Sequence, residues 1–308
     1  PMSTAFVAIG SNIDPAMHLQ QAARALKQRF PGARFSACYR NSAYGFEGDD
    51  FVNTVAGFDT DLTIAQLLLT EVKVDRIEIA SARVSEGEFA AVKTITRWAR
   101  ANGFANRVEV LTFVDGDTSV QWTLKAGARV MNLLTKGSLN HLTHQLKKKP
   151  EQHFADVAAA IALAKKKGLD CNVYLEDWSN GMRNSKKYVF QYLDFLQHQP
   201  VKRIMLPDTL GILTPAEVHA FVSETVQRYP HIHFDLHTHN DYDLGTANVL
   251  EGVKAGAHGI HLTINGMGER AGNTPLASAV AVLNDFVPDV KTNVAEASLY
   301  RVSKLVET

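Results

Sequence analysis

The sequence is poor in cysteine and contains no long apolar run, and these two absences narrow its class. Cys38 and Cys171 are the only cysteines and lie far apart, so no disulfide framework or cysteine metal motif is expected. No stretch reaches the roughly 18 consecutive apolar residues that a membrane-spanning helix requires. We therefore expect a protein of the reducing cytoplasm that has no membrane role.

An excess of charge of either sign is also missing. Lys and Arg number 32, Asp and Glu number 32, and the formal net charge is zero. A nucleic-acid partner would favour a basic excess, so none is expected. The 308 residues are 45% hydrophobic, which is enough for a sizeable core.

From about residue 63 onward, short strands rich in Val, Ile and Leu alternate with amphipathic helical segments. This alternation is typical of a parallel sheet with helical crossovers. We predict a TIM (β/α)8-type barrel over residues 61–308 with seven recognisable strands, one fewer than the fold requires. The seven expected strands are Asp75–Ala80, Arg107–Val114, Arg129–Leu134, Cys171–Leu175, Lys202–Leu206, His233–His237 and Gly259–Ile264.

Residues 1–60 follow another pattern and are predicted to form a separate domain, a short α+β segment that resembles a ferredoxin-like fragment. The expected order is a strand at Thr4–Gly10, a helix that Asp14 caps before Pro15, and strands at Ala33–Tyr39 and Phe51–Phe58.

The missing barrel strand must precede residue 63, so we also advance the hypothesis that Phe51–Phe58 fills its place. Asp59 or Asp61 would then lie near the candidate metal site described next.

The strongest chemical signal is the pair His237 and His239 at the end of an expected buried strand. Residues i and i+2 of a strand point to the same face, so the two imidazoles are presented together. Neutral imidazoles with oxygen ligands suit Zn²⁺, Mn²⁺ or similar ions. Asn240 or Asp241 could orient an imidazole from behind. We therefore predict a divalent-metal site that serves a reaction on a small molecule.

Further polar residues follow the ends of neighbouring strands, where the active sites of barrels lie. The loop at 265–273 is rich in glycine, which permits close backbone approach to a ligand, and its Asn273 can bring a carbonyl oxygen to the metal. Glu176, Thr209 and His141 follow three other strands. Their shared location makes them site candidates.

These motifs resemble a known family. The runs Asp235–Asp241 and Asn265–Asn273, together with Asp75–Ser81 and Leu206–Gly211, resemble the 2-isopropylmalate synthase and homocitrate synthase group of HMGL-like, DRE-TIM metallolyase barrels. The resemblance implies a divalent metal (Zn, Mn or Mg) and a Claisen-type condensation of acetyl-CoA with a 2-oxo acid. It also implies acyltransferase activity of the kind used in leucine biosynthesis, and a homodimer.

The resemblance also implies roles for single residues. His237, His239 and Asn273 match metal ligands, whereas Glu176 and Thr209 match catalytic positions that contact the 2-oxo acid or assist proton transfer. The remaining matches are substrate-binding positions: His141, Asn265, Gly266, Gly268 and Glu269.

One departure bears on activity. The family's first strand ends in an Arg-Asp pair whose Asp binds the metal and whose Arg stabilises developing negative charge, and no Arg-Asp pair occurs in this sequence. The alternative to an active synthase is therefore a catalytically inactive chimera that binds a metal or a small molecule.

The first residues resemble a second family. Phe6–Asn12, Tyr39–Gly45 and Asp50–Val55 resemble the start of 6-hydroxymethyl-7,8-dihydropterin pyrophosphokinase, and Asn53 matches a pterin-contacting position. The magnesium and ATP motifs of that family are absent, so we expect no kinase activity. A pterin-binding fragment is the third hypothesis, and a junction of two truncated families accounts for both resemblances.

Overall fold

The computed structural model describes residues 3–11, 14–29, 31–41, 51–60 and 63–307. Its contacts divide the chain into two compact units. Unit 1 comprises Pro1–Lys73 together with Ala295–Thr308, and unit 2 comprises Val74–Val294. The boundary that the sequence predicts after residue 60 separates the two family resemblances rather than the two contact units. It stays a prediction.

Unit 1 is built on an antiparallel sheet in which β4 (Phe51–Thr60) is the common partner. It pairs with β1 (Ser3–Ser11), β2 (Arg34–Phe35) and β3 (Tyr39–Asn41). Helix α1 begins at Pro15, directly after Asp14, as predicted. The other elements of this unit are α2 (Ile64–Leu67), the π-helical turn η1 (Leu68–Val72), the 3-10 turn η4 (Glu296–Ser298) and α12 (Leu299–Glu307).

The hypothesis that Phe51–Phe58 supplies the missing barrel strand is wrong. These residues belong to β4, which pairs antiparallel with all nine residues of β1 in a sheet of its own. An antiparallel partner of matched length satisfies the backbone groups of this segment, so no parallel barrel pairing is needed. The reason to expect Asp59 near a metal is thereby lost, and Asp61 lies outside the described residues.

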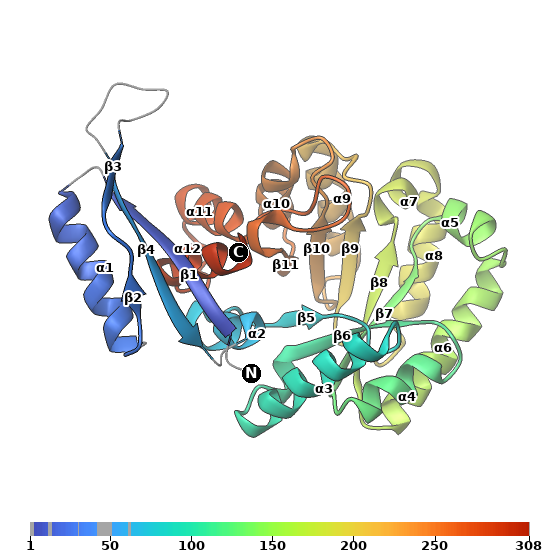
Figure 1. The fold of residues 1–308 in the computed structure, drawn as a ribbon. Helices are drawn as coiled ribbons and strands as arrows, with labels where there is room; N and C mark the ends of the chain where they lie inside the picture. The colour runs from blue at the N-terminus through green and yellow to red at the C-terminus, as the bar shows by residue number, and fades with distance from the viewer. Residues whose placement is uncertain (1–2, 12–13, 30, 42–50, 61–62, 308) are drawn as a thin grey trace. The chain divides into compact units, whose positions relative to one another are not determined.

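Unit 2 contains a curled sheet of seven parallel strands connected by helices (Figure 1), which confirms the predicted TIM-type α/β fold. The sheet order is β11-β10-β9-β8-β7-β6-β5, so each strand pairs with its neighbour in the chain, and no described strand joins β5 to β11. The strands are β5 (Ile77–Ile79), β6 (Val108–Phe113), β7 (Val130–Lys136), β8 (Asp170–Glu176), β9 (Ile204–Asp208), β10 (Phe234–Thr238) and β11 (Gly259–His261).

The helices of unit 2 begin where the sequence offers capping residues. The Ser85 hydroxyl accepts a hydrogen bond from the Glu88 N–H, and Thr214 forms a reciprocal capping box with Glu217. None of the helices in the described part of the chain is long and apolar enough to cross a membrane. The helices are α3 (Glu86–Ala101), α4 (Thr118–Lys125), α5 (Leu139–His144), α6 (Pro150–Lys166), α7 (Trp178–Asn184), α8 (Lys186–Leu196), α9 (Pro215–Arg228), α10 (Gly245–Lys254) and α11 (Leu276–Phe286), with 3-10 turns η2 (Ala105–Arg107) and η3 (Ile264–Gly266).

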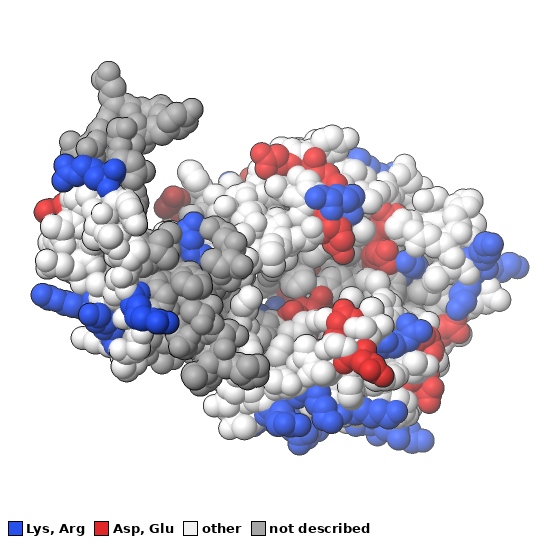
Figure 2. Space-filling model, in the orientation of Figure 1, with Lys and Arg blue, Asp and Glu red and all other residues white. Residues whose placement is uncertain are grey.

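The charged side chains on the outside of unit 2 pair between neighbouring helices. Lys186 contacts Glu224 at 2.8 Å, and Arg228 contacts Asp194 at 3.1 Å, with all four side chains well exposed. Figure 2 shows both signs interspersed over the face that it draws, with Lys and Arg gathered along the lower edge. Such exposed pairs contribute little to stability, typically about 0–1 kcal/mol each.

The sheet of unit 2 has an apolar outer face and a polar inner floor, because successive residues of each strand alternate between the two sides. Leu133, Val173 and Leu206 belong to the main core cluster together with residues of the surrounding helices. On the inner side, Asn172 donates a hydrogen bond to Asn132, which donates in turn to Glu109 at 2.9 Å.

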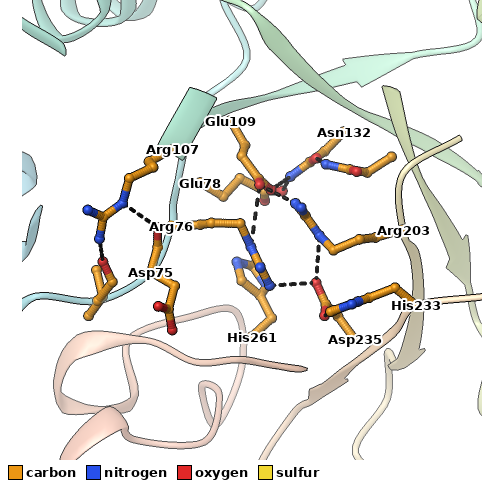
Figure 3. A network of polar contacts seen from close by, with 12 residues as sticks. Asp75, Arg76, Glu78, Arg107, Glu109, Asn132, Arg203, His233, Asp235 and His261 are labelled. Carbon is orange, nitrogen blue, oxygen red and sulfur yellow. Dashed lines mark hydrogen bonds and ion pairs between the residues drawn. The ribbon is translucent and has the colours of Figure 1, made fainter. Parts of the chain in front are cut away.

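Two arginines and two carboxylates complete this floor (Figure 3). Arg203 pairs with Glu109 and also donates to Asp235 at 3.1 Å, while Arg76 reaches Asp235 at 3.0 Å and Glu109 at 3.5 Å. Burial disfavours the charged form of Asp235, but the hydrogen bond from His233 and the two guanidinium groups outweigh it and lower its pKa. We call Arg76, Glu109, Arg203 and Asp235 the floor network.

We expect Arg203→Met to lower the free energy of unfolding of unit 2 by about 3–5 kcal/mol, because it leaves two buried carboxylates short of a partner. The matched control Arg228→Met removes an exposed pair and should cost less than about 1 kcal/mol. All three tryptophans (Trp98, Trp122 and Trp178) lie in unit 2, so urea unfolding followed by tryptophan fluorescence measures this unit. Equal losses in the two variants would contradict a structural role for the floor network.

A buried histidine in α6 supports the end of β7. His153 is 1% exposed, and its Nε2 accepts a hydrogen bond from the backbone N–H of Lys136 at 3.2 Å. Burial and the nearby charge of Lys148 lower the pKa of His153 to about 4. The unfolded chain therefore binds a proton near pH 6.5 that the folded protein does not bind until about pH 4.

It follows that the stability of unit 2 should fall as the pH is lowered from 6.5 to about 4, by up to roughly 1.4 kcal/mol per pH unit from this residue. His153→Gln can still accept the hydrogen bond but cannot titrate, so it should flatten this slope. The exposed His144→Gln should leave the slope unchanged. Urea unfolding at several pH values tests this expectation, and identical slopes in wild type and His153→Gln would refute it.

Candidate active site

The two histidines of the predicted metal site lie side by side at the end of β10. The ring centroids of His237 and His239 are 5.1 Å apart, and His239 is buried while His237 is partly buried. Thr238, between them, points to the opposite side of the strand, where its hydroxyl lies 2.6 Å from that of Thr274. The alternation expected of a strand thus brings the imidazoles together.

The glycine-rich loop is attached to the same strand end. His239 and Asn273 form an antiparallel bridge, and the Asn240 N–H donates to the Gly272 carbonyl at 3.0 Å. The side-chain amide nitrogen of Asn273 lies 3.2 Å from Nε2 of His237. The structure therefore brings together the three residues that the sequence predicts as metal ligands.

The loop residues that the sequence predicts to bind substrate help to set the path of the loop beside the end of β10. Asn265 and Gly266 have positive φ angles of 54° and 70°, and the Gly266 carbonyl accepts from the Asn273 N–H at 2.9 Å. A Cβ on Gly268 would lie 1.8 Å from Oδ1 of Asn273, so only glycine leaves room for this amide. Glu269 is largely exposed, with its carboxylate 3.9 Å from Nε2 of His239.

The chemistry of these side chains fits a divalent cation. Burial is the main cause that lowers the pKa values of His237 and His239, which favours the neutral imidazoles that a metal requires. Nδ1 of His239 is buried and has no hydrogen-bond partner. No three His, Cys, Asp or Glu side chains converge on a metal position within the described ranges, so a third protein donor beside the two imidazoles would have to be of another type, such as the predicted Asn273. Two imidazoles and one amide leave coordination positions open for a substrate.

A third histidine, which the sequence analysis does not single out, stands behind the pair. Nδ1 of His261 on β11 lies 2.8 Å from Nδ1 of His237 and 3.0 Å from the hydroxyl of Tyr174. Burial and the neighbouring Glu78 carboxylate raise the pKa of Tyr174, which keeps its hydroxyl neutral. The sequence gives little signal for this residue, because His261 becomes the neighbour of His237 only through the parallel register of β10 and β11.

Across the sheet, Glu176 and His141 form a second polar group at the same end of the strands. Glu176 shares the inner face of β8 with Tyr174, and Lys136 on β7 is paired with its carboxylate. Nδ1 of His141 lies 3.8 Å from Glu176, while its Nε2 lies 3.4 Å from the fully buried Asp177. Lys136 is a further site residue that the sequence analysis does not identify.

Thr209 lies beside this second group and also contacts the loop after β11. Its hydroxyl accepts a hydrogen bond from the Asp177 N–H at 2.8 Å, and its carbonyl accepts one from Arg270 at 2.8 Å. Arg270 also forms a two-point ion pair with Asp241 at 2.7 and 2.8 Å. Thr209 therefore connects the Glu176 side of the site with the loop that carries Asn273.

The expectation that Asn240 or Asp241 orients an imidazole is not met in the contacts that the structure provides. The side-chain amide oxygen of Asn240 accepts a hydrogen bond from the Gly245 N–H at the start of α10, and Asp241 binds Arg270. Both side chains are therefore engaged, one by an N–H at the start of a helix and the other by an arginine. The residue that contacts an imidazole from behind is His261.

A cleft of about 440 Å³ lies between α5 and α7, beside the Glu176 side of the site, and is lined by Asn140, Asn180 and Asn184 among others. The backbone of Asn53 pairs with Gly10 and Tyr39 in unit 1, but its side chain lies outside the described residues. A pterin contact at Asn53 stays a prediction.

Comparison with known proteins places these features in a family. The sequence model of the HMGL-like family matches residues 47–306. The chain is 31% identical over 252 residues to the 2-isopropylmalate synthase of Sulfurisphaera tokodaii, covering 80% of this chain and 63% of that one. It is 32% identical over 241 residues to a putative (R)-citramalate synthase of Archaeoglobus fulgidus, covering 78% and 47%. The chain thus spans about half to two thirds of the length of these relatives.

The solved structures agree at the level of the fold. The HMG-CoA lyase of Bacillus subtilis superposes with a TM-score of 0.67 at 20% sequence identity, covering 78% of this chain and 82% of that one. The resemblance that the motifs around His237 and Asn273 predict is therefore confirmed, whereas the pyrophosphokinase resemblance of the first residues stays a prediction. Since the family match covers most of the chain, including every strand of the parallel sheet, this protein belongs to the HMGL-like family.

Proposed function

We propose that unit 2 catalyses a metal-dependent Claisen-type condensation of acetyl-CoA with a 2-oxo acid. The observation that carries this proposal is the placement of His237, His239 and Asn273 at the same end of the sheet as the Glu176 carboxylate. The relatives named as 2-isopropylmalate and (R)-citramalate synthases support the reaction class. The balanced charge of the chain gives no reason to propose a nucleic-acid or membrane role.

His237, His239 and Asn273 would hold the cation, which when bound supplies Lewis-acid polarisation of the 2-oxo acid's carbonyl. On the other side, Glu176 accepts a proton from the acetyl methyl group, and the Lys136 ammonium holds this carboxylate in place. His141 relays the proton, because its Nδ1 lies 3.8 Å from Glu176 and makes no hydrogen bond of its own.

A carbon–carbon bond then forms between the acetyl methyl carbon and the polarised carbonyl carbon, and the carbonyl oxygen gains the proton that Glu176 and His141 took from the methyl group. Water then cleaves the thioester to a carboxylate and the free CoA thiol. The Thr209 hydroxyl, which accepts from the Asp177 N–H, keeps its own proton for the carboxylate of the 2-oxo acid. The cleft between α5 and α7, whose lining residue Asn180 donates a hydrogen bond to Asp177 beside Glu176, is the binding place that we propose for acetyl-CoA. We further propose a homodimer in the cytoplasm, where Cys38 and Cys171 remain free thiols.

One observation favours a second candidate function. No described strand lies between β5 and β11, and that is the position from which a first barrel strand would complete the site. A protein that binds a divalent metal without turnover is therefore the alternative. Because it retains the His237 and His239 pair, it predicts metal binding but no release of CoA.

The reaction is tested by thiol release from acetyl-CoA with 2-oxoisovalerate, pyruvate and 2-oxoglutarate, each with added Zn²⁺, Mg²⁺ or Mn²⁺. We expect release with at least one acid, and a decrease in kcat of roughly 10²–10⁴-fold in Glu176→Gln, which can no longer accept the proton. Glu224→Gln, an exposed carboxylate paired with a lysine, is the matched control and should keep full activity. If no acid supports thiol release, the condensation is excluded and the binding alternative stands.

The metal site is tested separately by zinc content and by competition with a chromophoric chelator. His239→Ala should lose most bound zinc, because the proposed site draws three protein donors from the described residues. His219→Ala removes an exposed histidine on α9 and should bind zinc like the wild type. Equal zinc content in all three proteins would contradict the assignment of the metal ligands.

A further inference from the structure

A chain of polar contacts continues from His237 away from the proposed metal position. Nε2 of His237 faces Asn273, and its other ring nitrogen, Nδ1, lies 2.8 Å from Nδ1 of His261. The two rings are tilted by 32° with centroids 5.0 Å apart, so the contact joins the nitrogens rather than the ring faces. The His237 side chain is partly buried, and the rings of His239, His261 and Tyr174 pack around it.

A neutral imidazole carries one proton, and its position decides which nitrogen can bind a metal. Binding through Nε2, the atom that faces Asn273, requires the proton of His237 to be on Nδ1. A buried Nδ1–H needs an acceptor, because an unpaired buried donor costs about 1–3 kcal/mol. The acceptor at hydrogen-bond distance is Nδ1 of His261.

We propose that His261 is a positioning residue that accepts the Nδ1 proton of His237 and thereby fixes His237 in the tautomer that can bind a metal through Nε2. The proposal rests on the metal site of the proposed function. Metal-binding histidines usually donate their second nitrogen to a carboxylate, a backbone carbonyl or water. Here a second imidazole takes that place.

The surroundings of His261 are compatible with this role. The Tyr174 hydroxyl lies 3.0 Å from the same Nδ1 atom and also neighbours Glu78, and a hydroxyl rotates to direct its proton to either group. Tyr174 packs edge-on against both His237 and His261, with centroids 6.1 Å away in each case, and so limits the rotation of both rings. The register of β10 and β11 places the two histidines directly opposite each other.

The first test uses the metal-free protein. Long-range ¹H–¹⁵N correlation spectra of ¹⁵N-histidine-labelled protein distinguish the two tautomers, and His237→Gln identifies the signal of residue 237. We expect the Nδ1–H form in the wild type and a mixture of both forms in His261→Leu, which offers no acceptor. The Nε2–H form as the main species in the wild type would overturn the proposal.

The second test measures zinc affinity by competition with a chromophoric chelator. His261→Leu should bind zinc about 10–100-fold more weakly, which is the usual cost of losing a partner of a metal-binding histidine. His261→Asn places an oxygen acceptor near the position of Nδ1 and should restore the affinity to within a few-fold of the wild type. Tyr174→Phe, which keeps the two histidines, is the matched control and should change the affinity little.

Thermal unfolding of the metal-free variants separates this role from a purely structural one. A structural role predicts that His261→Leu and His261→Asn bind zinc like the wild type once both are folded, and that result would overturn the proposal. A wild type that binds no zinc contradicts the proposed function instead, and the tautomer of His237 in the metal-free protein then decides this proposal alone.

Discussion

The pairing of two partly buried arginines with two buried carboxylates is the constraint on which the rest of unit 2 depends. Each buried carboxylate would cost several kcal/mol inside the sheet without a partner, so the strands must take positions that bring the arginines to both. Arg203, one residue before β9, binds Glu109 of β6 and Asp235 of β10, two strands that are not neighbours of each other. An ion pair that spans several strands restricts the curvature of the sheet as well as the order of its strands.

The same constraint determines which way β10 faces at its other end. With Asp235 held on the inner side by Arg76 and Arg203, the period of two residues places His237 and His239 on that side as well. Tyr174 and Glu176 follow the same rule on β8, and the contact of Tyr174 with His261 links the two sides of the site. The orientation of the candidate ligands is thus a consequence of charge pairing deeper in the sheet.

The sequence predicts the parallel sheet well because strand and helix periodicity are local signals. It also predicts the meeting of His237, His239 and Asn273, since strand ends in parallel sheets share one edge. It does not predict the partners of Arg76, because the contact with Asp235 spans 159 residues and depends on sheet curvature. Helices α5 and α7 are too short to show a period, and His261 gains its meaning only from the register of two strands. The sequence does not predict that β4 pairs with β1, because residues that suit a buried strand do not specify their partner strand.

The order of the strands has a consequence for motion. Strand β8, which ends at Glu176, occupies the middle of the seven and has a hydrogen-bonded neighbour on each side, whereas β11, which carries His261, ends the sheet. Local opening costs least where a strand has one neighbour and most where it is enclosed. The Glu176 side of the proposed site therefore lies on an enclosed strand, whereas the His237 side lies next to a strand with one neighbour, where we expect faster exchange of amide hydrogens. A ligand bound between the two sides would hold the edge strand in place, so its occupancy and the rigidity of this end of the sheet should rise together.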